Sequence, residues 1–454
     1  MGRSAAFFDL DRTLLRGASG PAIGAALRDA GVLPARRLPG EALVYKVFDL
    51  IGETLPSMAM ARQAVTVASG WSADAVVAAA EAAADVLTGQ VQPWAHQLMA
   101  EHRAAGRAVV LATTTPFDVV APFAQRLGLD DVIATRYGRR DDGTYDGSIT
   151  GNFVWGTGKL AAVRAWALEH GVDLRESWAY SDSVYDTPLL HAVGHPTAVN
   201  PDPRLAVVAA VRRWPVLHLD VPPGVPKLAG IEPMQAARPI LQPVALPFAR
   251  FDISGTAHLP RTGPAIVVAN HRSYFDPVLL AMVATRAGRS IRFLGKKEVF
   301  DAPVIGQLAR ALGAIEVDRG SGSDAPLRAA ARALEAGEVV AVLPQGTIPR
   351  GPEFFDPVLK GRPGAALLAA ATGAPVVPVG IWGTERVWPR SSKLPRLLTF
   401  NPPRVSATVG PVLDRPDLDT MLAAIADLLP PEARQLRTPT AAELRATYPG
   451  GHLP

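Results

Sequence analysis

The first half of the chain carries acidic residues that could move a phosphoryl group. Asp9 and Asp11 directly follow the apolar run Ala5–Phe8, which has the pattern of a buried parallel strand. The carboxyl ends of parallel strands are where α/β folds bind their ligands. Asp9 is therefore a candidate nucleophile that would form an aspartyl phosphate. Asp11 is a candidate acid for the leaving oxygen and a candidate base for the attacking water.

So crowded an acidic site calls for Mg²⁺, which takes few protein carboxylates and completes its shell with water and phosphate. Its candidate ligands are Asp9, Asp11 through its backbone, and Asp182, with Asp186 behind them. Thr113 and Lys159 would hold the remaining phosphate oxygens and neutralise their charge. Taken singly, these residues have plainer interpretations as turn caps, a strand end or a solvated lysine. Their order and their strand context favour the chemical interpretation.

The second half carries a histidine and an aspartate whose spacing suits a catalytic pair. His271 and Asp276 are five residues apart, about 140° on a regular helix, so they would not share a helix face. However, the apolar run Ala265–Ala269 predicts a strand, and Pro277 favours a helix start. A strand-to-helix turn could bring both side chains together, with Asp276 orienting the imidazole as in a Ser-His-Asp triad. His271 would then deprotonate a substrate hydroxyl that attacks an acyl thioester. The plainer interpretations are a helix cap and a turn histidine.

Two further stretches could bind the substrate of this pair. Arg319 follows the predicted strand Ile315–Val317 and fits a phosphate clamp, or else a surface ion pair with Asp318 or Glu316. In a later loop, backbone amides could approach a phosphate or an oxyanion. This loop contains Gln345, Gly346 and Thr347, and we expect it to lie on the phosphate side, away from the His271 turn.

The first half resembles the haloacid-dehalogenase-like hydrolases, in the phosphoserine-phosphatase-like branch with a helical cap (subfamily IB), over about residues 3–215. The resemblance rests on the string DLDRTLL at 9–15, on Thr113 and Lys159, and on YSDSVYDTPLL at 180–190. It implies a Rossmann-like domain and a Mg²⁺-dependent phosphomonoesterase. The cap, about 17–90, would select the substrate, and its few charges from 73 to 91 favour one less polar than phosphoserine.

The second half resembles the glycerolipid acyltransferases of the lysophosphatidate (1-acylglycerol-3-phosphate) type, over about residues 245–415. Four motifs carry the resemblance: Asn270–Asp276, Gly313–Arg319, Pro344–Thr347 and Val376–Gly380. It implies an α/β domain that moves an acyl chain from acyl-CoA or acyl carrier protein to a lysophospholipid. Gln345 stands where the family usually has Glu, and Arg350 would replace an Arg usually found near Ile348. The acceptor therefore need not be lysophosphatidate.

At 454 residues the chain is long enough for two domains. We expect a phosphatase domain at 1–218, a Pro-rich linker at 219–244, an acyltransferase domain at 245–430 and a loosely held polar tail at 431–454. Strands alternate with helices in both halves, which predicts α/β folds with parallel sheets.

Composition restricts the partners. The net charge is +4 without long basic runs or a nucleic-acid motif, and the chain has no cysteine for disulfides or thiolate metal sites. No signal peptide is recognisable, and the uncharged stretch 363–384 is too rich in Ala, Gly and Pro to predict a span. We expect a cytoplasmic protein with peripheral membrane contact through the apolar segment Ile240–Phe251, which lies between Arg238 and Arg250. The alternative is a linker packed on the second domain.

Together these features predict a bifunctional enzyme of lipid metabolism: an acyltransferase acting on a lysophospholipid such as 1-acylglycerol 3-phosphate, joined to a phosphomonoesterase. One alternative is a small-molecule phosphatase with an altered acyltransferase domain. The other makes one domain an inactive lipid-binding module.

Overall fold

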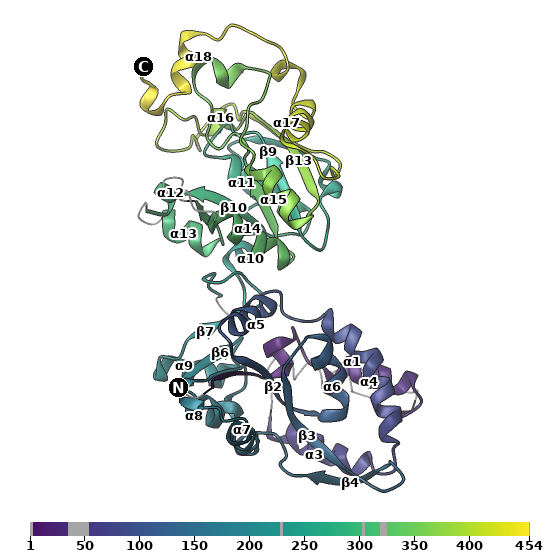
Figure 1. Cartoon of the computed structure of the whole chain (residues 1–454). Coiled ribbons are helices and arrows are strands. Elements are labelled where there is room, and N and C mark those ends of the chain that lie inside the picture. The colour runs from purple at the N-terminus through teal and green to yellow at the C-terminus, as the bar shows by residue number, and fades with distance from the viewer. Residues whose placement is uncertain (1–2, 35–53, 228–229, 302–304, 318–324, 454) are drawn as a thin grey trace. The chain divides into compact units, whose positions relative to one another are not determined.

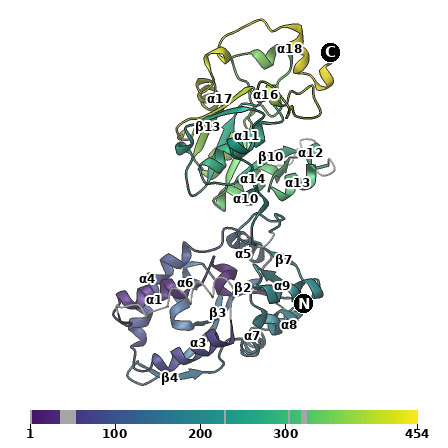
Figure 2. The same cartoon turned by 180° about the vertical axis from the view of Figure 1, so that it is seen from behind.

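A computed structural model of the chain describes residues 3–34, 54–227, 230–301, 305–317 and 325–453. The chain forms two compact units, Met1–Pro223 and Gly224–Pro454. Within the described residues, each unit is built on one seven-stranded sheet flanked by helices (Figures 1 and 2). Both units are therefore α/β, as the alternation of strands and helices predicted.

The sheet of the first unit is parallel except for one edge strand. Its order is β4-β3-β2-β1-β5-β6-β7, and β4 alone runs antiparallel to its neighbour. The strands are β1 (Ala5–Phe8), β2 (Ala108–Pro116), β3 (Asp131–Arg139), β4 (Tyr145–Thr150), β5 (Trp178–Ser181), β6 (His195–Val199) and β7 (Val216–Leu217). Central β1 pairs with β2 and β5, so the residues that follow these three strands meet at one sheet edge.

The described part of the chain between β1 and β2 is helical. Its helices are α1 (Gly20–Asp29), α3 (Leu55–Val67), α4 (Ala73–Thr88) and α5 (Ala95–Ala104). Helices α1 and α4 pack together with α6 (Phe117–Arg126), whereas α3 lies beside β4 (Figures 1 and 2). The Ser72 side chain accepts a hydrogen bond from the Ala75 amide and so caps the N-terminus of α4. The remaining helices of this unit are α7 (Thr157–Glu169), α8 (Thr187–Ala192) and α9 (Pro203–Arg212).

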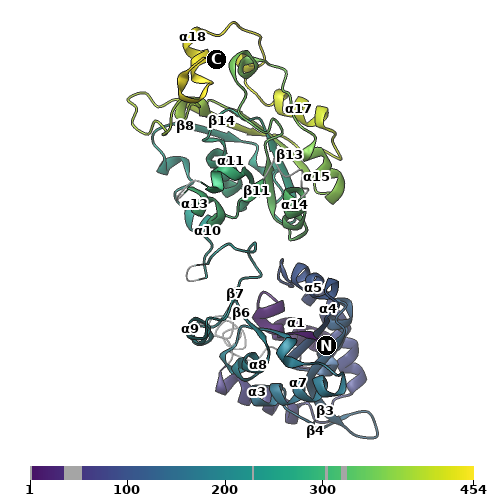
Figure 3. The same cartoon turned by 60° about the vertical axis from the view of Figure 1, so that its left-hand side comes forward.

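The sheet of the second unit has the order β11-β10-β12-β9-β13-β14-β8. Its strands are β8 (Arg250–Ser254), β9 (Ala265–Ala269), β10 (Ile291–Lys296), β11 (Ile315–Val317), β12 (Val339–Val342), β13 (Val376–Trp382) and β14 (Arg404–Val409). Strand β14 runs antiparallel to β13 and carries β8 at the sheet edge (Figure 3). Central β9 is apolar and buried along its whole length, because it has strand neighbours on both edges and helices over its faces.

The helices of the second unit mostly connect successive strands. They are α10 (Pro233–Ala237), α11 (Asp276–Arg286), α12 (Lys297–Asp301), α13 (Ile305–Ala311), α14 (Ala325–Glu335), α15 (Gly364–Thr372), α16 (Thr384–Val387), α17 (Leu418–Asp427) and α18 (Ala441–Ala446). Within the described ranges, no helix is both long enough and apolar enough to cross a bilayer.

The apolar segment 240–251 packs on the second unit, so the prediction that it inserts into a membrane is wrong for most of its side chains. Four of them lie against the core: Leu241, Leu246, Phe248 and Phe251. The rings of Phe248 and Phe251 both contact that of Phe275, at the start of α11. Of the six apolar residues expected to enter the membrane, Ile240 and Val244 are the exposed ones.

Glu232 lies within the stretch predicted to be a linker, yet it is buried in the second unit. Its carboxylate is 2.9 Å from the guanidinium of Arg292 and accepts a hydrogen bond from Ser290. Arg292 is also buried and makes a second ion pair with Glu338, whose pKa is raised by its burial. The stretch from Glu232 onward therefore belongs structurally to the second unit.

The C-terminal tail is ordered rather than loosely held, contrary to expectation. Helix α18 begins with a capping box between Thr440 and Glu443, and the same glutamate forms a two-fold ion pair with Arg437. Buried Thr447 accepts a hydrogen bond from the Gly351 amide at 2.8 Å. These local bonds fix a segment whose polar composition predicted mobility.

Candidate active sites

Asp9 lies at the carboxyl end of β1, where the chain turns tightly through 10–14. Its amide donates to the Tyr180 carbonyl on β5, and this bond fixes the start of the turn. The Asp11 carboxylate accepts a hydrogen bond from the Ser19 amide, just before α1. Arg12 has a φ of 58°, a strained value for a residue with a side chain. The turn therefore holds both predicted carboxylates above the sheet edge at some conformational cost.

A buried lysine links the proposed nucleophile to the fourth motif. The Lys159 ammonium lies 2.7 Å from Asp9 Oδ1 and 2.6 Å from Asp186 Oδ2, and its side chain is 1% exposed. Helix α7 carries this lysine after a tight turn. There a Cβ on Gly158 would lie 2.2 Å from the Phe153 carbonyl oxygen, which explains the glycine. Two carboxylates offset the cost of burying this charge.

The two aspartates of the fourth motif have different partners. Asp182 directly follows β5, and its carboxylate is 3.3 Å from Arg12 Nε. Asp186 Oδ2 accepts a hydrogen bond from the Ser181 hydroxyl in addition to Lys159. The other oxygen of Asp186 is buried without a hydrogen-bond partner. Sequence reasoning missed the Arg12–Asp182 contact, since neither the spacing nor the residue type points to it.

The donor set fits Mg²⁺ in its chemistry. Among the described residues, no three His, Asp or Glu side chains are grouped closely enough to hold a metal unaided. Mg²⁺ needs few carboxylates once water and a phosphate supply the rest. Asp9 and Asp182 are buried carboxylates beside the same turn, and the unpartnered oxygen of Asp186 is an open acceptor for a metal-bound water.

Thr113 occupies the adjacent strand β2. It lies two residues beyond Leu111, which pairs with Phe8 just before Asp9. The Thr113 side chain is buried, and its hydroxyl accepts from the Thr115 amide at 3.2 Å. Strand register therefore brings Thr113 to the edge where Asp9 and Asp182 lie.

In the second unit, the chain folds back between β9 and α11 and brings the side chains of His271 and Asp276 together. His271 Nδ1 lies 2.8 Å from Asp276 Oδ2. A carboxylate can only accept, so Nδ1 carries the proton and Nε2 keeps its lone pair for a substrate. Phe275, not Asp276, is the N-cap residue of α11. The helix-cap interpretation of Asp276 therefore does not hold.

Asp276 is completely buried and organises the whole turn. Its Oδ2 also accepts from the amides of Arg272 and Ser273, at 2.6 and 2.9 Å. Its Oδ1 accepts from the Thr384 hydroxyl at 2.6 Å. Four donors on one carboxylate fix its position, so the imidazole is held in one orientation.

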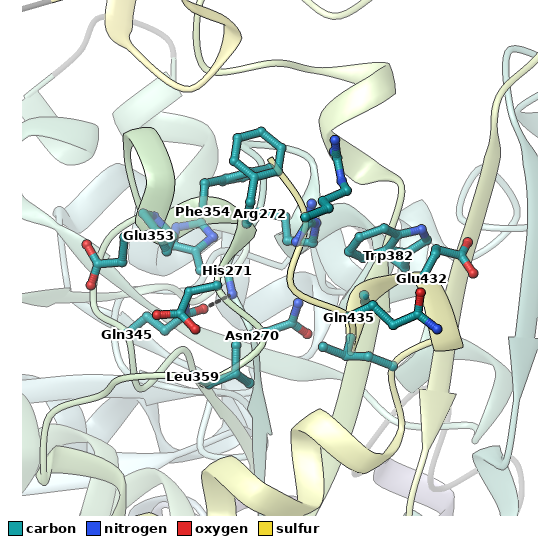
Figure 4. A pocket seen from close by; sticks show the side chains of 16 residues that line it. Asn270, His271, Arg272, Gln345, Glu353, Phe354, Leu359, Trp382, Glu432 and Gln435 are labelled. Atoms are coloured by element: carbon teal, nitrogen blue, oxygen red, sulfur yellow. Dashed lines mark hydrogen bonds between the residues drawn. The ribbon is translucent and has the colours of Figure 1, made fainter. Parts of the chain in front are cut away.

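Gln345 contacts the His271 turn directly, which corrects our expectation that it lies away from it. Its side-chain oxygen accepts a hydrogen bond from the His271 amide at 2.6 Å (Figure 4). Asn270 fixes the other side of the turn through two bonds to the backbone of Ile381 on β13. The glutamine therefore helps to position the catalytic candidate.

Arg272 braces the same turn through its side chain. The guanidinium forms a two-fold ion pair with Glu385, with both N–O distances at 3.1 Å. It also lies between the rings of Trp382 and Phe354, at 4.0 and 4.3 Å from their centroids. This contact set ties the His271 turn to the end of β13 and to the 3₁₀ turn Gly351–Phe355.

His271 lies at a pocket whose wall includes the C-terminal segment (Figure 4). Glu353 and Phe354 line the pocket from the 3₁₀ turn, and Trp382 lines it from β13. Glu432, Gln435 and Arg437 line it from the tail. Among the described residues, no serine or threonine lines the pocket, so the arrangement suits a hydroxyl brought by the substrate.

Three other predicted residues have different outcomes. The Gly346 amide donates to the Leu343 carbonyl at 2.8 Å, so it closes the turn instead of facing a ligand as expected. Thr347 is half-buried and is not among the residues that line the pocket. Arg319 lies outside the described residues.

The Gln345 contact predicts that Gln345→Leu lowers kcat for acyl transfer by about 10- to 100-fold. An unpaired buried amide costs about 1–3 kcal/mol, and here that cost falls on the turn that orients His271. Gln345→Glu keeps an acceptor oxygen and serves as the matched control, with turnover close to wild type. Steady-state thiol-release kinetics on both variants measure this. Equal kcat in Gln345→Leu and wild type would show that the bond does not position His271.

Comparison with known proteins agrees with this geometry. Residues 6–191 match the haloacid dehalogenase-like hydrolase family, and residues 250–382 match the acyltransferase family. The chain is 36% identical over 222 residues to the "inhibition of morphological differentiation protein" of Streptomyces azureus. The matched residues make up 48% of this chain and 80% of that protein. It is 35% identical over 216 residues to a phosphoserine phosphatase of Mycobacterium tuberculosis, over 47% of this chain and 70% of that one.

Among solved structures, the 1-acyl-sn-glycerophosphate acyltransferase of Thermotoga maritima is 24% identical, with a TM-score of 0.34, over 43% of this chain and 75% of that chain. Haloacid dehalogenase-like phosphatases generally use Mg²⁺, in keeping with the carboxylates around Asp9. The chain belongs to the haloacid dehalogenase-like hydrolases through its first unit and carries an acyltransferase domain in its second.

Proposed function

We propose that the protein is a bifunctional enzyme of lipid metabolism. The second unit would move an acyl chain from acyl-CoA or acyl carrier protein to a lysophospholipid such as 1-acylglycerol 3-phosphate. The observation that carries this proposal is the 2.8 Å contact between His271 Nδ1 and Asp276, with the imidazole at a pocket that no described serine or threonine lines.

In this reaction, His271 Nε2 takes the proton of the acceptor hydroxyl while its oxygen attacks the thioester carbonyl. The tetrahedral intermediate then expels the thiolate, which receives the proton from the imidazolium. Asp276 stabilises the imidazolium and keeps its orientation. Gln345 and Arg272 act through the position of the turn and touch no reacting atom.

The first unit would hydrolyse a phosphomonoester. Asp9 attacks phosphorus and forms an aspartyl phosphate, while Asp11 protonates the leaving oxygen and later deprotonates the attacking water. Lys159 and Thr113 would bind the phosphoryl oxygens. Asp9, the backbone of Asp11, and Asp182 would hold Mg²⁺, which would neutralise phosphate charge, with Asp186 in support. The buried bridge of Lys159 between Asp9 and Asp186 supports this assignment.

A second candidate makes the phosphatase the main activity, with phosphoserine or a similar soluble metabolite as substrate. The 35% identity to a phosphoserine phosphatase favours it. Helix α4 has three acidic residues among its 16, Asp74, Glu81 and Asp85, which matches the 19% charged content of the whole chain and does not favour a less polar substrate.

Lipid mass analysis of purified protein tests both proposals. The protein is incubated with acyl-CoA or acyl carrier protein and a panel of lysophospholipids, and separately with phosphoserine and lysolipid phosphates, with Mg²⁺ or with EDTA. We expect diacyl product with at least one lysophospholipid, and phosphate release that EDTA abolishes. Phosphate release from phosphoserine without any acyl transfer would favour the second candidate. Neither activity would mean that both proposals are wrong.

The proposed acceptor and product reside in a bilayer. We therefore retain, as part of the proposal, that the protein is cytoplasmic and works at a membrane surface. The segment 240–251 is unsuited to that contact because it packs on the core, so another surface has to supply it.

A further inference from the structure

The connection between α16 and β14 exposes four large apolar side chains within seven residues. Leu394 is 74% exposed, Leu397 51%, Leu398 98% and Phe400 111%. Each such side chain forgoes the free energy of burial while it remains in water. Contiguous apolar exposure of this kind marks an interaction site.

All the charged residues of this connection are basic. From Arg386 to Arg404, with both ends counted, the sequence has five basic residues and no acidic one. Arg404 pairs with Asp252 on β8. Lys393 and Arg396 are exposed and form no ion pair with a described residue. Apolar side chains beside unpaired cations complement a surface that has anionic charge over an apolar interior.

The base of this connection is attached to the acyltransferase site. The Ser273 hydroxyl donates to the Trp388 carbonyl at 2.6 Å, and the Trp388 ring contacts that of Tyr274. Arg390 donates to the Ile348 carbonyl, in the loop that follows Gln345. The connection therefore starts from both segments that position His271.

We propose that residues 392–401 form a membrane-docking loop. The loop inserts Leu394, Leu397, Leu398 and Phe400 into the interfacial region of a bilayer that contains anionic lipids. Lys393 and Arg396 bind the headgroups. We expect the loop to bring the His271 pocket to an acceptor in the bilayer, and this role rests on the proposed function. The binding of the loop to a bilayer does not rest on it.

A bilayer fits better than a protein partner for a geometric reason. Leu398 and Phe400 are nearly or fully exposed, so each protrudes without packing against the rest of the unit. Lipids rearrange around single protruding side chains, whereas a protein needs a preformed pocket for each one.

Vesicle flotation of the full chain tests the loop. Vesicles contain phosphatidylglycerol and phosphatidylcholine in equal parts. We expect the wild type to float and the double variant Leu398→Ser/Phe400→Ser to lose at least about tenfold in vesicle affinity, because two apolar side chains no longer insert. Lys393→Gln/Arg396→Gln should weaken binding to these vesicles and reduce its salt dependence. Leu168→Ser/Val211→Ser, which alters two exposed apolar residues of the first unit, should float like wild type.

Thermal unfolding should be unchanged in the loop variants, since the altered side chains touch no core. Failure of the wild type to float, or equal flotation of the double variant, overturns the proposal. A further outcome would also overturn it: the wild type does not float, and Leu398→Ser/Phe400→Ser lowers the affinity of the protein for acyl carrier protein. The loop would then be a protein-docking site. Flotation needs no turnover. A chain that floats without acyl transfer would therefore contradict the proposed function alone.

Discussion

Asp9→Asn should lower phosphatase turnover by several orders of magnitude and leave acyl transfer near wild type. The amide has the shape of the carboxylate but cannot attack phosphorus, so the covalent route is lost. It also removes one of the two carboxylates that contact Lys159. Phosphate release from a model phosphomonoester and thiol release from an acyl thioester, measured on the same preparation, give both rates.

Asp9→Glu is the matched control for that lost charge. It keeps a carboxylate for Lys159 but displaces the attacking oxygen by one methylene. We expect Asp9→Asn to lower the thermal stability, because Lys159 loses one of its charged partners, and Asp9→Glu to retain it without restoring turnover. If Asp9→Asn in a folded protein also abolishes acyl transfer, the two activities share a substrate path. If the Asp9→Asn variant retains phosphatase activity, Asp9 is not the nucleophile.

His271→Ala should do the reverse and lower acyl transfer by ~10²–10⁴-fold, the usual effect of losing a general base. Phosphatase activity should be unchanged, because the motifs of the two units do not interleave. The His271 side chain is 17% exposed, so the folding of the alanine variant has to be checked. Asp276 keeps three of its four hydrogen-bond donors, and the turn should persist.

The same two assays measure this variant, with thermal unfolding as the check on folding. Arg386→Ala, at an exposed residue of the same unit outside the pocket lining, is the control and should transfer acyl chains at the wild-type rate. Full acyl transfer in His271→Ala would exclude Nε2 as the base. Loss of both activities would point to coupling between the units.

Much of the fold was predictable because buried strands and capped helices leave local signals. The bounds of β9 and β11 agree with the strands Ala265–Ala269 and Ile315–Val317 expected from the sequence, and α11 begins beside Pro277 as expected. The edge strand β8 was not predicted, although polar and apolar residues alternate through Arg250–Ser254, because its five residues hold only two apolar side chains and overlap the end of the apolar segment 240–251. The two-residue strand β7 is too short to leave a pattern.

In the acyltransferase site, the His271–Asp276 turn was predictable because both residues lie on adjoining local elements. The Gln345 contact was not, because it joins residues 74 positions apart and depends on how β12 and β9 align. Arg12, with its positive φ, had no sequence signal either. The ordered tail does have a sequence signal, because Thr440 and Glu443 have the spacing of a capping box. The polar composition around them masks this signal.

Glu232 determines where the two enzymes could be cut apart. A fragment that began at Leu246 would leave Arg292 buried with Glu338 as its one remaining carboxylate, and breaking a buried ion pair typically costs about 3–5 kcal/mol. A fragment that began at Gly224 would keep the pair. Recombination that exchanged one phosphatase for another upstream of this acyltransferase would therefore have to join within the few residues between Pro223 and Glu232.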